Sequence, residues 1–128
     1  MRLSLAVSAL SVVLATGGSA LAHHSFAAEF DGNKPIRLQG TLSRLEWTNP
    51  HSWFYVDVKD DSGKLVTWGC EGASPVALSR QGFQKGLAKI GDKLVVDGYQ
   101  AKDGSHLMNA RRIYLIGKMI FEQMGEGN

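Results

Sequence analysis

Alternating apolar and polar residues fill most of the chain from Ile36 onward, and a repeat of two is typical of β-strands with one buried face. The alternation is clearest where Phe54, Val56 and Val58 occupy one phase and Trp53, Tyr55 and Asp57 occupy the other. Clusters rich in Gly, Asp and Ser interrupt the pattern and indicate hairpin turns. The pattern therefore predicts strands at about residues 36–47, 53–59, 65–70, 93–100 and 106–116.

The first of these strands changes phase part of the way along. Leu38 and Leu42 share one phase, whereas Leu45 and Trp47 fall in the opposite one. A single extra residue in one strand produces such a shift and bends the strand. We therefore expect a β-bulge near Ser43-Arg44.

Between the third and fourth strands the period changes to that of a short helix. Ser74 is a good N-cap, Pro75 suits the first helical position, and Gly82 is a good terminator. The resulting order of three strands, one helix and two strands is that of an OB-type barrel. We predict a mostly β fold, a small five- to six-stranded OB-like barrel with one short helix between strands three and four. A six-stranded sandwich that recruits the C-terminal tail is the alternative.

The first residues have the three parts of a secretory signal. Arg2 provides a positive charge, Leu3 to Ala15 is largely apolar, and Ala20-Leu21-Ala22 fits the small-x-small cleavage pattern. The apolar run is shorter than the roughly 20 residues that a membrane-spanning helix needs. We expect cleavage after Ala22, and hence a periplasmic or secreted protein with no membrane span after signal cleavage.

The remainder of the chain is of a length that forms one domain. Residues 23–34 are polar and irregular, and those beyond 117 lack a clear period; we expect the latter to pack loosely or as a short helix. The expected organisation is a signal peptide at 1–22, an N-terminal arm at 23–34, a β-barrel domain at 35–117 and a C-terminal tail at 118–128.

Composition narrows the possible partners. The chain has 14 basic and 12 acidic residues, so it lacks the strong positive field with which proteins bind nucleic acids, and no nucleic-acid partner is expected. Its one cysteine, Cys70, cannot form an internal disulfide, and we interpret it as a small apolar core residue.

The four histidines suggest a metal site. Cleavage after Ala22 makes His23 the first residue, and a terminal amine together with the imidazole of the same residue forms a chelate suited to Cu(II). His51 lies in the loop after the first strand and His106 follows the loop after the fourth, and these two loops flank the ligand face of an OB fold. The hypothesis is a copper or other transition-metal site built from His23, His24, His51 and His106. A solvent-exposed arm without a ligand role is the alternative.

Exposed aromatic residues suggest a second kind of site. Trp47, Trp53 and Tyr55 can form a ligand face that receives a small apolar or aromatic ligand or a partner protein. The sequence contains none of the common hydrolase, metalloprotease or phosphate-loop motifs, so we expect an exported binding module rather than an enzyme. The ligand face and the histidine site remain alternatives at this point.

Several segments together resemble a known bacterial exported family, the domain of unknown function 6152. The most specific is Glu46-Trp47-Thr48-Asn49-Pro50-His51-Ser52-Trp53. The resemblance implies export and a small β domain, and it carries no established activity and no catalytic residues. The other segments that carry it are His23-His24-Ser25-Phe26, Glu71-Gly72-Ala73-Ser74-Pro75, Gly91-Asp92 and Ala101-Lys102-Asp103-Gly104-Ser105.

Overall fold

A computed structural model describes residues 26–116 and 118–122 of the chain. The fold is mostly β, with six strands and two short helices in this part of the chain. The helices are α1 (Phe26–Glu29) and α2 (Pro75–Arg80). The strands are β1 (Phe30–Glu46), β2 (Trp53–Lys59), β3 (Leu65–Glu71), β4 (Lys93–Ala101), β5 (Leu107–Leu115) and β6 (Lys118–Glu122).

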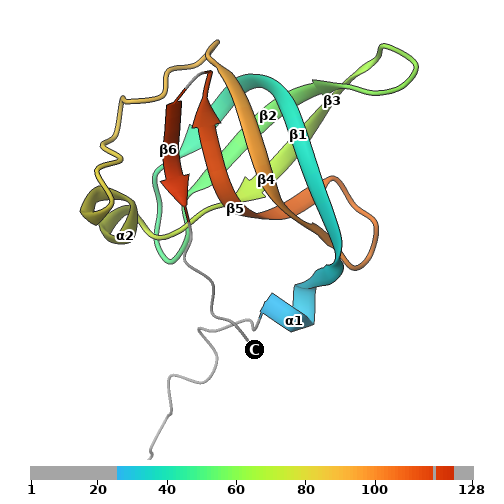
Figure 1. Cartoon of the computed structure of the whole chain (residues 1–128), viewed down its shortest axis with the longest axis horizontal. Helices are drawn as coiled ribbons and strands as arrows, with labels where there is room; N and C mark the ends of the chain where they lie inside the picture. Colours follow the sequence, from blue (N-terminus) through green and yellow to red (C-terminus); the bar gives the residue numbers. More distant parts are fainter. Residues whose placement is uncertain (1–25, 117, 123–128) are drawn as a thin grey trace, which may run out of the picture.

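Five of the strands form a closed ring of backbone hydrogen bonds. The sheet order is β3-β2-β1-β4-β5-β6, and a further parallel pairing between β3 and β5 closes the ring (Figure 1). The other neighbours in the sheet are antiparallel. In Figure 1, α1 lies below one end of the ring beside the start of β1, and α2 lies at its side, between β3 and β4 in the chain.

The long strand β1 pairs with a different strand along each of its two parts. From Phe30 to Thr41 it pairs with β4, and from Thr41 to Glu46 it pairs with β2. Its register with β2 shifts between Leu42 and Arg44, which confirms the predicted bulge. Gly40 sits at this crossing, where a Cβ atom would lie only 2.2 Å from the backbone oxygen of Asp57. The close approach of β1 and β2 therefore requires glycine there.

The side chains inside the ring are those that the alternation of apolar and polar residues in the sequence predicts to be buried. Phe54 and Val56 are fully buried, whereas Tyr55 between them is only partly buried, so the predicted phase of β2 is confirmed. Helix α2 begins as predicted, with the Ser74 hydroxyl accepting a hydrogen bond from the Ala77 N–H at 3.2 Å. Buried residues from all five strands and from the α2 region form one cluster: Leu38, Leu42, Phe54, Val56, Cys70, Leu78, Phe83, Ala88, Leu94, Val96, Met108, Ala110 and Ile113.

Strand β1 begins earlier than the sequence predicted. The segment before Ile36 was expected to be irregular, but β1 begins at Phe30, which pairs with Ala101 and is buried. The register with β4 shifts between Phe30 and Pro35, so the polar residues in that interval are not held to the alternation of a regular strand. The same segment contains α1, a second short helix that the sequence did not predict.

The C-terminal tail also differs from the prediction. Residues 118–122 were expected to pack loosely or as a short helix, but they form β6, which pairs with the C-terminal half of β5. The tail thus supplies a sixth strand, which the five- to six-stranded prediction allowed and which the sandwich alternative assigned to it. The N-terminal half of β5 pairs with β3, so β6 extends the sheet where the β3 pairing stops. Within the described ranges, 26–116 and 118–122, there is no helix of the length and apolar character needed to cross a membrane.

The interior phase of β2 leads to a stability prediction. Val56→Asp places a carboxylate without a partner at a fully buried position, and we expect it to lower the free energy of unfolding by more than about 3 kcal/mol. Tyr55→Ser, on the outer face, should cost about 1 kcal/mol. Urea denaturation followed by circular dichroism measures both.

Val56→Thr, which nearly keeps the shape of valine, should cost about 1–2 kcal/mol and covers the case in which the aspartate variant does not fold. Equal losses for the outward and inward positions would contradict the assigned phase.

Candidate functional site

Two stacked aromatic rings lie on the outer face of β2. Trp53 and Tyr55 alternate with buried Phe54, and their ring centroids are 6.4 Å apart with nearly parallel planes. Gly69 lies opposite Tyr55 on β3, and a Cβ atom there would approach Leu107 to 2.7 Å and the Trp53 ring to 3.6 Å. The absence of a side chain at this position lets Leu107 and Trp53 come together over β3.

Two adjoining hollows share Trp53 and Glu29 as lining residues, and together we call them the Trp53 groove. The first, of about 290 Å³, is lined by the loop from Thr48 to His51 and by Glu46 and Glu71. The second, of about 440 Å³, is lined by α1 and the start of β1, by the β4–β5 hairpin and by Leu107. The β1–β2 loop therefore lines one hollow and the β4–β5 hairpin lines the other, and Trp53 belongs to both.

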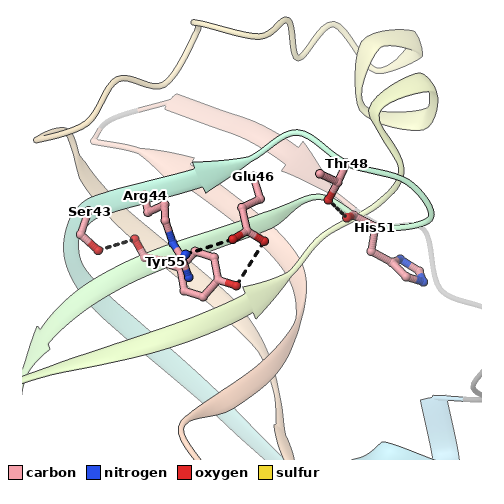
Figure 2. A network of polar contacts seen from close by, with 6 residues as sticks. All are labelled: Ser43, Arg44, Glu46, Thr48, His51 and Tyr55. Carbon is pink, nitrogen blue, oxygen red and sulfur yellow. Dashed lines mark hydrogen bonds and ion pairs between the residues drawn. The ribbon is translucent and has the colours of Figure 1, made fainter.

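A network of polar contacts fixes the wall of the groove next to Trp53 (Figure 2). Arg44 Nη1 lies 3.1 Å from Glu46 Oε1, and the Tyr55 hydroxyl donates to Glu46 Oε2 at 3.3 Å. The Arg44 guanidinium also lies 3.7 Å above the centre of the Tyr55 ring. Burial, and then the charge of Glu46, raise the pKa of Tyr55, so its hydroxyl stays protonated and keeps donating. Since Arg44 covers one face of Tyr55, Trp53 is the aromatic surface that lines the groove.

His51 fastens the β1–β2 loop to the end of β3. Its Nδ1 lies 3.1 Å from the carbonyl oxygen of Gly72, and its Nε2 lies 3.2 Å from Glu71 Oε1. The Thr48 hydroxyl donates to the His51 carbonyl at 3.0 Å. Figure 2 shows the imidazole pointing away from the network around Glu46 and Tyr55. The Glu71 side chain is only 9% exposed, whereas that of His51 is 44% exposed. The largely buried carboxylate of Glu71 therefore has its ion-pair partner, His51, at the surface of the groove.

His106 lies elsewhere. Its ring is 5.0 Å from the ring of Trp68, which is paired with the core residue Val56 and faces the same side of the sheet. Glu71, the partner of His51, is three positions along β3 and therefore on the opposite face. The contacts of His51 and His106 thus fall on different faces of β3.

The other two predicted ligands, His23 and His24, lie outside the described residues. Across the described part of the chain, no group of three or more His, Cys, Asp or Glu side chains is arranged to hold a metal ion. The four-histidine site therefore remains a prediction that depends on the N-terminal residues.

Trp47 and Cys70 belong to the core rather than to the groove. The Trp47 ring is 5.6 Å from that of Phe83 and packs against the buried cluster, which separates it from Trp53. Cys70 is fully buried, and burial raises the pKa of its thiol to about 12. A thiol with such a pKa carries almost no thiolate at neutral pH, which agrees with the interpretation of Cys70 as an apolar core residue.

Sequence reasoning missed part of the groove. Glu29 and Phe30 were assigned to an irregular arm, so nothing placed them beside Trp53. Leu107 carries a weak signal, because it is an apolar residue in the outward phase of its strand and is 39% exposed. Its position beside Trp53 depends on the pairing of β3 with β5, which no local pattern reveals.

No curated protein is significantly similar to the chain. A protein-family model, described as a family of unknown function (DUF6152), matches residues 10–109. The matched range contains every residue of the Trp53 groove and covers most of the chain. The resemblance seen in the sequence is thus confirmed, and the chain belongs to the DUF6152 family.

Proposed function

We propose that this protein is an exported, non-catalytic binding module that takes a small apolar or aromatic ligand into the Trp53 groove. The observation that carries the proposal is that the β1–β2 loop and the β4–β5 hairpin line two hollows that share the Trp53 side chain. These are the two loops that flank the ligand face of an OB fold, and the closed strand ring with a helix after β3 supports an OB-type barrel. The signal-like residues 1–22 support a periplasmic or secreted location.

The lining of the groove defines the chemistry of the ligand. Trp53 and Leu107 offer an apolar wall, and Glu29, Glu46 and Glu71 bring an excess of carboxylates. An ionised carboxylate has about four acceptor positions, so one that already holds a partner can still accept from a ligand. The ligand that fits best has an aromatic or apolar ring and a basic or hydrogen-bond-donating group. A partner protein would have to present the same chemistry, such as an aromatic side chain next to a lysine or arginine.

A pair of probes with the same ring and opposite charge tests this proposal. Tryptamine should bind in the Trp53 groove, and indole-3-acetate should bind more weakly because its carboxylate faces the glutamates. Trp53→Ala should weaken tryptamine binding roughly 3- to 10-fold, which corresponds to the loss of one aromatic pair. Chemical-shift titration by NMR measures the affinity and shows which residues respond.

A matched control for that experiment is Leu65→Ala, which removes a large apolar side chain that is 61% exposed and does not line the groove. It should leave tryptamine binding unchanged. The proposal is wrong if both variants behave alike, or if tryptamine shifts residues away from both loops.

A copper site is the second candidate, and one observation favours it. Glu29 lines the same hollow as His51, and Phe26 anchors α1 by packing against Phe30 and Tyr99. His24 is two positions before Phe26 in the sequence, and a residue can span up to about 3.8 Å, a length of chain that would allow a site shared with His51. Together with a processed His23 terminus, His51 would supply a further nitrogen ligand through Nε2, which would have to exchange its contact with Glu71 for the metal.

The copper hypothesis predicts a dependence on the N-terminal amine. Protein that begins at His23 should bind Cu(II) more tightly than protein with an added N-terminal Gly-Ser, because the extension destroys the amine–imidazole chelate. His51→Ala should weaken binding further, whereas His106→Ala should have a smaller effect because that ring packs on Trp68. Isothermal titration calorimetry measures each affinity. Identical affinities for the native and extended termini, with no effect of either substitution, would rule the site out.

A further inference from the structure

A third hollow, separate from the Trp53 groove, lies on the outer face of β1, β4 and β5. It has a volume of about 320 Å³, which falls within the range of small-molecule sites. Arg37, Arg111 and Arg112 line it together with a single carboxylate, Asp97. Its apolar walls come from Pro35, Ile36 and Tyr99. The composition is thus the reverse of that of the Trp53 groove, with cations in place of carboxylates.

A β-bulge brings two of these arginines to one face. The pairing of β4 with β5 shifts between Asp97 and Gly98, which pair with Arg112 and Ala110 respectively. Arg111 is therefore the extra residue of β5. Ala110 and Ile113 are both fully buried, so the two residues between them both face outward. A regular strand would direct one of two adjacent side chains into the core, and the bulge instead turns both to the surface.

Gly98 allows this arrangement. A Cβ atom at Gly98 would lie 2.0 Å from the backbone oxygen of Asn109 and 2.7 Å from Met108 Cε. Any side chain would push β5 away from β4 at the bulge. The backbone at the floor of the hollow therefore depends on glycine.

The carboxylate in the hollow is already engaged. Arg37 binds Asp97 with two hydrogen bonds, from Nε at 2.6 Å and from Nη2 at 2.7 Å. These bonds, with the charges of Arg37 and Arg112, hold the pKa of Asp97 below its usual value despite partial burial. Asp97 is therefore ionised at neutral pH and committed to Arg37.

Arg111 has no such partner. Its guanidinium lies 4.7 Å from the centre of the Phe26 ring and 5.7 Å from that of Tyr99, so aromatic rings hold it in place. Among the described residues no carboxylate pairs with it, and its buried Nε has no hydrogen-bond acceptor. A buried donor without an acceptor is costly to a protein. Because protein atoms cover this Nε, a ligand in the hollow would reach Arg111 through its terminal Nη groups.

We infer that this hollow binds a small carboxylate with an apolar or aromatic body, and that Arg111 is the residue that holds the carboxylate. Both rings lie within cation–π distance of the Arg111 guanidinium. Its two terminal Nη groups carry paired N–H donors whose spacing matches a carboxylate. Tyr99 and Pro35 then provide a surface for the body of the ligand. This inference does not depend on the function proposed for the Trp53 groove.

Titration with benzoate, followed by NMR, tests the inference. Benzoate should bind and shift residues around Tyr99, and acetate should bind more weakly because it lacks the apolar body. Arg111→Met should weaken benzoate binding roughly tenfold or more, since it removes charge-assisted hydrogen bonds. Arg111→Lys keeps the charge but loses the planar pair of donors, so it should give an intermediate loss.

Two further variants make the result specific. Asp97→Asn removes the competing carboxylate and frees Arg37, so it should tighten benzoate binding, a direction that simple structural damage would not produce. Arg80→Met on α2 removes an arginine outside the hollow and should have no effect.

Retained tryptamine shifts around Trp53, or an unchanged circular dichroism spectrum, would show that the Arg111 variants still fold. The inference is overturned if Arg111→Met binds benzoate as the natural protein does, if acetate binds as tightly as benzoate, or if Trp53→Ala abolishes benzoate binding.

Discussion

The parallel pairing of β3 with β5 is the contact on which the rest of the structure depends. It joins Gly69, Cys70 and Glu71 to Leu107, Met108 and Asn109, and it turns an open sheet into a ring. Closure buries Cys70 and Met108 inside the ring. It also carries the β4–β5 hairpin to the side of Trp53, since Leu107 follows directly from that hairpin. Without this pairing, the β1–β2 loop would have no second wall opposite it.

Local chemistry made much of the fold predictable. The phase of β2, the bulge in β1 and the start of α2 each depend on neighbours within a few residues, such as Ser74 and the Ala77 N–H that it caps. The misassigned parts depend on distant partners. Phe30 is a strand residue because it pairs with Ala101, and β6 exists because half of β5 is left without β3. Neither relation leaves a periodic signal in a short polar or terminal segment.

The candidate sites were predictable to a similar extent. Strand phase alone placed Trp53 and Tyr55 on an outer face, but it did not separate them from Trp47, which packs on Phe83. The near balance of 14 basic and 12 acidic residues conceals two hollows of opposite character, one rich in glutamate and one rich in arginine. A balanced overall charge argues against binding long polyanions, which need a large positive surface. It does not reveal local groups of like charge, such as those in the two hollows, that could bind small charged ligands. The arginine hollow depends on the bulge in β5, and consecutive arginines in a sequence do not predict a bulge.

Native-state hydrogen exchange at the amide of Gly69 tests ring closure most directly. This N–H donates to the His106 carbonyl at 3.0 Å across the β3–β5 pairing, so it reports whether the two strands stay joined. If β3 and β5 close the ring, the Gly69 amide should be protected to nearly the same degree as the amides that pair β1 with β4. Exchange as fast as that of exposed loop amides, while β1 and β4 remain protected, would mean that the ring is open and that the Trp53 groove lacks its second wall.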